Sequence, residues 1–246
     1  MDKGKTDKDK GYSFYALSQN AKIEQQLVFA ALEPKLPPSK DARILDAACG
    51  TGWLAGKLAA KYGRVWGFDV SHALISEAKE NFPEVDLKVA DAAGELPYQN
   101  DCFDAVILNM AAHDIEDLPR ALTNFSRILK PGGKLLMAVA NPYYAFPVGI
   151  WKRGWLGFLL RRKPVLKLRD YAQFCRNPQR GFVWKKDIRS YFYTLPEYVK
   201  ISKQAGFDLL GLQEIVSDKD SSRFDRSYQM FRFPLILLLE LEKPRE

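Results

Sequence analysis

Cysteine is scarce in this chain of 246 residues, and long apolar runs are missing. The three cysteines, Cys49, Cys102 and Cys175, are odd in number and form no paired spacing of a metal or redox site. This usage suits a reducing cytoplasm, and we expect no bound metal. The longest apolar run, FPLILLLE, is far short of the ~20 residues that a transmembrane helix needs. The opening MDKGKTDKDKGYSF has no apolar stretch, so residues 1–19 predict a solvated tail and N-terminal cap rather than a signal peptide.

The order of the apolar runs predicts an α/β fold. A hydrophobic content of 47% suits one enlarged domain over residues 1–246. Strand-like runs alternate with amphipathic ones, the pattern of βαβ units and a parallel sheet. The predicted strands are residues 43–48, 64–69, 86–90, 105–109 and 134–140, after a helix in AKIEQQLVFAAL and with further helices starting near Gly52, Ser71 and Leu118. Residues 195–207 predict a late helix, and DLLGLQEIV and RFPLILLLELEK predict a hairpin joined by a polar loop.

A glycine turn, CGTG, connects the first strand to its helix in the stretch ILDAACGTGW. Gly50 and Gly52 allow a tight turn and a close ligand, because a Cβ would block both. Such turns usually suit an anion, but Asp46 directly ahead would repel a phosphate. The carboxylate favours a ligand that is cationic there, such as S-adenosylmethionine, with its ammonium and sulfonium. With Ala55, the glycines also satisfy the looser dinucleotide fingerprint, so an NAD-dependent oxidoreductase stays an alternative.

Two more carboxylates follow the next two strands. Asp69 ends the second strand, where it can accept hydrogen bonds from both hydroxyls of a ribose. Asp91 follows the third strand and can accept from an adenine amino group, while the N–H of Ala92 can donate to a ring nitrogen. Three acids at three successive strand ends predict one lined crevice.

These motifs resemble the class I S-adenosylmethionine-dependent methyltransferases, within them the group acting on small molecules. The resemblance covers residues 42–141, through ILDAACGTG, VWGFDVS, VADAAGELPYQNDCFDAVILN and RILKPGGKLLMAVA, and resumes at LPEYVKISKQAGFDLLGLQE. It implies a Rossmann-like three-layer sandwich whose mostly parallel sheet has the order 3-2-1-4-5-7-6 with an antiparallel last strand. It also implies that the cofactor S-adenosylmethionine is held by Asp46, Ala48, Gly50, Gly52, Asp69, Val70, Asp91, Ala92, Asn109 and Met110.

The region after the fourth strand departs from the family pattern. Many relatives carry a histidine just before the apolar residue that leads into the next helix, whereas this chain has Asp114 there and His113 one place earlier. We expect His113 to act as a base only if it faces the crevice. The motif NPYY resembles the Asn-Pro-Pro-Tyr of amino-group methylases but follows the fifth strand. The fourth strand is followed by NMAA, which argues against methylation of adenine or glutamine amino groups.

Residues 142–193 predict a lid or substrate insert. Within it, residues 151–190 hold twelve Lys and Arg against two Asp, a net charge of +10 that leaves −3 for the rest of the chain. Four of its apolar residues fall at helical spacing and predict an amphipathic helix: Trp151, Trp155, Phe158 and Leu159. The interpretations are a lid over the acceptor side, capture of an acidic or lipophilic substrate, and docking on an anionic membrane surface. Aromatics among cations also suit RNA, although nucleic acid is the less favoured partner.

The sequence thus predicts a cytoplasmic S-adenosylmethionine-dependent methyltransferase acting on a small molecule that is acidic or lipophilic. In-line transfer needs alignment more than acid–base chemistry, and alignment can supply on the order of 7 to 11 kcal/mol. A non-catalytic cofactor-binding protein that docks on RNA or anionic membranes is the alternative of another class. The sequence makes no prediction of the oligomeric state. Candidates for the substrate side are Tyr12, Tyr15, Trp151, Tyr191 and Tyr193.

Overall fold

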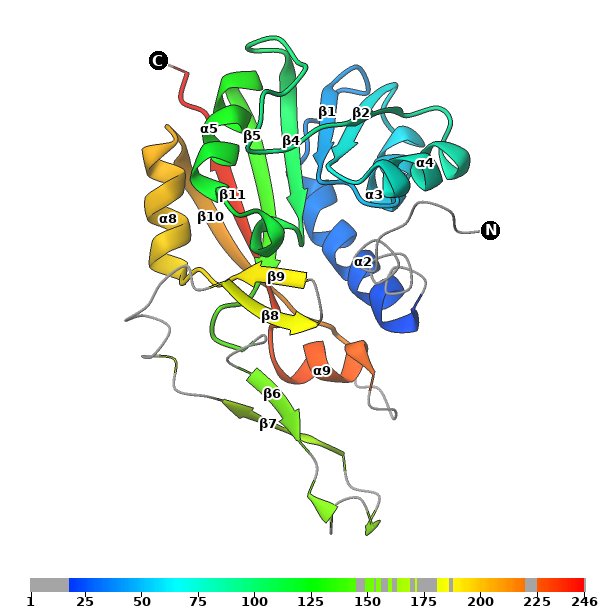
Figure 1. Ribbon diagram of the computed structural model, residues 1–246, viewed down its shortest axis with the longest axis vertical. Coiled ribbons are helices and arrows are strands. Elements are labelled where there is room, and N and C mark those ends of the chain that lie inside the picture. Colours follow the sequence, from blue (N-terminus) through cyan, green and yellow to red (C-terminus); the bar gives the residue numbers. More distant parts are fainter. Residues whose placement is uncertain are drawn as a thin grey trace.

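A seven-stranded sheet forms the centre of the molecule, in the order β10-β11-β5-β4-β1-β2-β3 (Figure 1). The computed structural model describes residues 18–144, 149–152, 154–155, 159–160, 163–168, 171, 181–185, 188–219 and 225–245. The strands of the sheet are β1 Arg43–Ala47, β2 Arg64–Asp69, β3 Asp86–Val89, β4 Phe103–Asn109, β5 Leu129–Ala140, β10 Asp208–Ile215 and β11 Ile236–Glu242. β11 is antiparallel to both of its neighbours, and β1 to β5 are parallel. The predicted strand order is therefore confirmed.

Several helices begin at a short polar side chain that caps them, whereas α3 begins after Gly52 without a side-chain cap. They are α2 Gln19–Leu32, the 3-10 turn η1 Glu33–Lys35, α3 Trp53–Ala59, α4 His72–Asn81, the 3-10 turn η2 Ala112–Asp114, α5 Leu118–Ile128, α8 Leu195–Gln204 and α9 Arg226–Arg232. The side chains of Ser18, Ser71 and Asp117 each accept a hydrogen bond from the backbone N–H three residues later. The predicted helix starts near Ser71 and Leu118 are confirmed. The predicted polar loop between the last two strands is wrong in part, because α9 begins within it.

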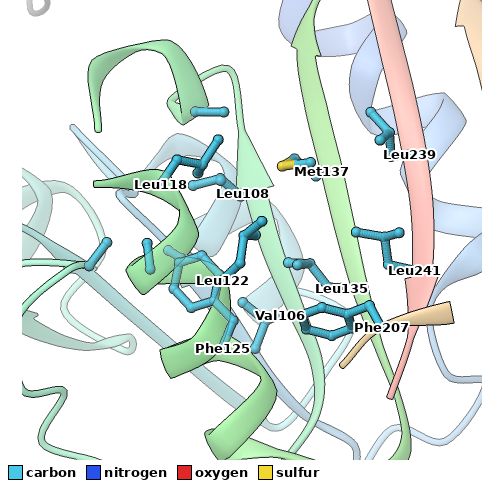
Figure 2. Packing of buried hydrophobic residues seen from close by; sticks show 14 of the residues in the cluster. Val106, Leu108, Leu118, Leu122, Phe125, Leu135, Met137, Phe207, Leu239 and Leu241 are labelled. Carbon is cyan, nitrogen blue, oxygen red and sulfur yellow. The ribbon is translucent and has the colours of Figure 1, made fainter. Parts of the chain in front are cut away.

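The central strands of the sheet are buried on both faces, which gives them their apolar character, whereas the edge strand β10 is largely exposed. Alternate residues of β4 enter opposite cores: Val106 and Leu108 pack beneath α5 and α8, whereas Ala105 and Ile107 join the core with α2, α3 and α4. Figure 2 shows the first of these cores, in which Leu122 and Phe125 of α5 lie against the sheet. The three-layer sandwich predicted from the sequence is therefore present.

The insert after β5 contains two hairpins. β6, Gly149–Lys152, pairs with β7, Val165–Leu168, and β8, Gly181–Lys185, pairs with β9, Ile188–Tyr191. The predicted helix is wrong at Trp151, which lies in β6, because strand pairing overrides its helical spacing. Phe158 lies outside the described residues. Figure 1 shows the β6–β7 hairpin extending away from the sheet beyond α9, and its role as a lid stays a prediction. None of the described helices has the length and apolar character needed to cross a membrane.

Candidate cofactor site and active site

The turn between β1 and α3 is held by backbone geometry that favours glycine. Gly50 and Gly52 have φ of 56° and 78°, the left-handed region in which a side chain is strained. A Cβ on Gly52 would lie 2.9 Å from the Cβ of Ala78 on α4, whereas a Cβ on Gly50 would meet no atom within 4 Å. Gly52 is therefore required for packing, and Gly50 borders open space where a ligand can approach.

Asp46 is enclosed behind this turn. Only 2% of the residue is exposed, and its Oδ2 accepts a hydrogen bond of 3.1 Å from the N–H of Ala55 in the first turns of α3. Burial raises the pKa of Asp46, the hydrogen bond from Ala55 lowers it, and the charge of Asp69 adds to the rise; together they bring it to about 8. A cation nearby would favour the ionised carboxyl, and an anion would be repelled. The preference for a cation that was inferred from the sequence stays a prediction, and the carboxyl does not open directly onto solvent.

Asp69 joins the end of β2 to the glycine turn. Its Oδ2 accepts a hydrogen bond from Gly50 N and its Oδ1 one from Ser71 N, both at 2.9 Å. An ionised carboxylate can accept more than two hydrogen bonds, so these contacts are compatible with a ribose ligand. The next residue, Val70, is 65% exposed and offers an apolar surface beside the carboxylate.

Asp91 and Ala92 lie in a turn after β3. Asp91 is exposed, and its Oδ1 accepts from the N–H of Ala93 at 2.9 Å. Asn124 of α5 donates from its Nδ2 to the carbonyls of Ala92 and Gly94 at 2.8 and 2.7 Å. Asn124 therefore fixes this turn, a role that sequence reasoning missed, because Asn124 is one of several polar residues of the amphipathic α5 and nothing in the sequence distinguishes it.

Two strained residues lie at neighbouring strand ends, beside the glycine turn. Ala48 follows β1 and Met110 follows β4, and their φ values are 53° and 54°. Non-glycine residues seldom adopt this conformation, which concentrates at functional sites. Beside Met110, the Oδ1 of Asn109 is buried and has no hydrogen-bond partner among the described residues. An unpaired buried acceptor costs about 1–3 kcal/mol, so this position fits a ligand that donates a hydrogen bond, as an ammonium does.

His113 lies in η2, beside an acidic neighbour. Its Nε2 is 3.8 Å from Oδ2 of Asp114, and its Nδ1 is buried without a hydrogen-bond partner in the described part of the chain. Ser190 of β9 donates to Oδ1 of Asp114 at 3.2 Å, which ties the second hairpin to η2. The carboxylate would stabilise a protonated His113, so a proton-accepting role is chemically sound and stays a prediction.

Among the substrate-side candidates in the described part of the chain, Tyr191 and Tyr193 share one core, and Trp151 packs elsewhere. Tyr193 is 2% exposed, lies 5.4 Å from Tyr198 between ring centroids, and has a pKa that burial raises to about 12. It is a core residue here, while Tyr191 is half-buried against the same core. Trp151 packs on α9, 6.1 Å from Tyr228 between ring centroids. Tyr12 and Tyr15 lie outside the described residues.

Neither Cys49 nor the cleft between α2, α3 and α4 is assigned a part in catalysis. Burial, then the charges of Asp46 and Asp69, raise the pKa of Cys49, so its thiol stays protonated. A cleft of about 460 Å³ opens between α2, α3 and α4 and touches the turn only at Thr51. In the described residues, no three His, Cys, Asp or Glu side chains are grouped to hold a metal ion.

Comparisons with known proteins agree with this geometry. A family model described as a methyltransferase domain matches residues 45–137. A demethylmenaquinone methyltransferase of Bacillus cereus is 27% identical over 175 residues, 68% of this chain and 70% of that protein. A malonyl-[acyl-carrier protein] O-methyltransferase of Erwinia pyrifoliae is 31% identical over 128 residues, 52% of this chain and 48%, about half, of that protein. A solved S-adenosylmethionine-dependent methyltransferase from Mesorhizobium loti shares the fold, with a TM-score of 0.70 and 20% identity over 88% of this chain and 97% of that chain.

The matched residues contain the whole candidate cofactor site. They run from within β1 to within β5 and so include the turn and the ends of β2, β3 and β4. The open space at Gly50, the buried acids and the unpaired Asn109 oxygen fit S-adenosylmethionine, the cofactor of these proteins. The NAD-dependent alternative is thereby set aside. Residues 45–137 of the chain thus match a methyltransferase domain, and the chain has the fold of the class I S-adenosylmethionine-dependent methyltransferases.

Proposed function

We propose that this protein transfers a methyl group from S-adenosylmethionine to a small acceptor that is lipophilic or acidic. The observation that carries the proposal is the strained backbone of Ala48 and Met110 at the ends of adjacent strands, beside the open space at Gly50. The acceptor class is supported by relatives named for demethylmenaquinone and for malonyl-[acyl-carrier protein]. The net charge of +10 in residues 151–190 also favours an acidic group on the acceptor.

The residues of the site act mainly by binding and alignment. When bound, S-adenosylmethionine supplies an activated methyl group on a positively charged sulfur. Asp69 holds the glycine turn and offers its carboxylate to the ribose, and Asn109 offers an acceptor oxygen near the end of β4. Since in-line transfer depends on position, this alignment is the main catalytic contribution.

Acid–base help comes from few groups. We assign His113 the role of accepting a proton from an acceptor hydroxyl, with Asp114 stabilising the resulting imidazolium at 3.8 Å. Cys49 takes no part as a nucleophile, because its thiol stays protonated.

The test combines binding and turnover. Calorimetry should show that S-adenosylhomocysteine binds far more tightly than NAD, and labelled S-adenosylmethionine should release S-adenosylhomocysteine with a quinol or a carboxylic acid from an acceptor panel. Equal or tighter binding of NAD would overturn the cofactor assignment. Cofactor binding without turnover on any acceptor class would favour the non-catalytic alternative instead.

A further inference from the structure

The β6–β7 hairpin has two chemically different faces. Residues paired directly across an antiparallel ladder point to the same side. Trp151 pairs with Leu166, Lys152 with Val165, and Ile150 with Lys167. Trp151 and Leu166 therefore share one face, while Lys152, Val165 and Lys167 share the other.

The face with Trp151 is anchored to the body of the protein. The Trp151 ring lies 5.8 Å from the ring centroid of Phe233, just after α9. Lys163 also reaches α9, with its Nζ 3.9 Å from the ring centroid of Tyr228. These contacts fix the hairpin, so that Lys152, Val165 and Lys167 on its other face are exposed.

The segment that joins the two strands exposes large apolar side chains. Trp155, Leu159 and Leu160 are 80%, 68% and 52% exposed. A group of such side chains at the end of a projecting element is unusual in a monomer and marks an interaction surface.

Positive charge accompanies these apolar side chains. Residues 151–168 contain six Lys and Arg and no Asp or Glu. Trp prefers the interface between lipid headgroups and acyl chains, and cations next to it gain from anionic headgroups. The combination of exposed apolar side chains and cations is that of elements that lie in a membrane interface.

We propose that this hairpin docks the protein on an anionic lipid bilayer. Trp155, Leu159 and Leu160 enter the interfacial layer, while Lys152 and Lys167 face the headgroups. Exposed leucines distinguish this surface from a single-stranded RNA site, where aromatic rings stack on the bases. Figure 1 shows the hairpin on the side of the sheet where the carboxyl ends of β4 and β5 lie. Docking would therefore turn this end of the sheet, with the candidate site, towards the bilayer. Docking itself does not depend on the proposed methyl transfer.

The experiment is sedimentation of the full chain with vesicles of phosphatidylcholine, with and without phosphatidylglycerol. We expect stronger binding to the anionic vesicles, reduced by salt. Each lysine near the membrane surface changes the partition coefficient into anionic vesicles by about fivefold. The double variant Lys152→Gln/Lys167→Gln should therefore bind these vesicles roughly 25-fold more weakly at low salt. Trp155→Ser/Leu159→Ser should weaken binding also at high salt, where the cations contribute little.

The matched control is Lys79→Gln/Lys203→Gln, which removes two exposed lysines from α4 and α8. It should bind vesicles like the unmodified chain. The proposal fails if the control loses as much binding as the hairpin variant, if anionic vesicles are not bound, or if an RNA oligonucleotide is bound in their place. Affinity for S-adenosylhomocysteine should be the same in all variants. If the unmodified chain does not bind S-adenosylhomocysteine, the result counts against the proposed function and not against docking.

Discussion

The carboxylate of Asp69, at the end of β2, accepts a hydrogen bond of 2.9 Å from the backbone N–H of Gly50, in the turn after β1. One side chain therefore joins two strand ends that are neighbours in the sheet. The bond orients the turn before any ligand arrives, and it places the negative charge of Asp69 beside the open space at Gly50. Asp69 thus has a structural role in the turn, and in the proposed function it also binds the ribose.

Replacing Asp69 should damage cofactor binding first. Hydrogen bonds to charged groups contribute about 1.5–3 kcal/mol, so Asp69→Ala should weaken S-adenosylhomocysteine binding by roughly tenfold to hundredfold. Asp69→Asn keeps one acceptor oxygen and should lose less. Calorimetry on both variants checks the order of the losses. An unchanged dissociation constant for Asp69→Ala would show that the ribose lies elsewhere.

His113→Ala should act on turnover and leave cofactor affinity nearly unchanged. A positioned general base typically contributes about 10²–10⁴-fold to the rate, and a loss in this range is expected with a hydroxyl acceptor. His113→Gln, which keeps a polar side chain but cannot take up a proton at neutral pH, is the matched variant. Full turnover in both variants would remove His113 from the mechanism and leave alignment alone.

The buried Asp46 should make the protein less stable at alkaline pH. Its pKa is 3.8 in its ordinary state and about 8 in the folded protein, so between these values the folded state holds one more proton than the unfolded state. Stability therefore falls as pH rises towards 8 and levels off above it. From pH 6 to pH 8 the free energy of unfolding should fall by about 2 kcal/mol.

Asp46→Asn tests this linkage. Its amide oxygen can still accept a hydrogen bond from Ala55, but no charge has to be buried. From pH 6 to pH 8 the free energy of unfolding of the variant should therefore rise by about 2 kcal/mol relative to that of the unmodified protein. Urea unfolding at the two pH values measures the difference. Cofactor affinity should fall in the same variant, since the preference for a cation is lost. A pH-independent difference would mean that Asp46 is ionised in the folded state at neutral pH.

Two alanine substitutions in the turn should separate packing from ligand access. Gly52→Ala places a Cβ 2.9 Å from that of Ala78 in a left-handed conformation, and we expect a loss of about 2–4 kcal/mol of unfolding free energy. Gly50→Ala carries only the backbone strain, of order 1 kcal/mol, yet its methyl group enters the ligand space. It should therefore lose more cofactor affinity than stability. Thermal unfolding and calorimetry on the pair decide this, and equal stability losses would contradict the assigned roles.

The sequence by itself determined the framework of the fold and where along it the candidate cofactor residues lie. Apolar runs, capping residues such as Ser71, and the glycine turn act over a few neighbouring residues, so their pattern predicts strands, helix starts and the turn directly. The resemblance of the motifs implied the strand order, which the structure confirms. The acids Asp69 and Asp91 were placed correctly at strand ends for the same local reason.

Only the tertiary structure decided how individual side chains are surrounded. Burial of Asp46 and Tyr193, the bracing contacts of Asn124, and the strand conformation of Trp151 all depend on partners far along the chain. The helical spacing of Trp151, Trp155 and Leu159 states a local preference, which pairing with β7 overrode at Trp151 and which Trp155 and Leu159 follow. Burial and strand pairing sum contributions from distant segments, and no short window of sequence contains them.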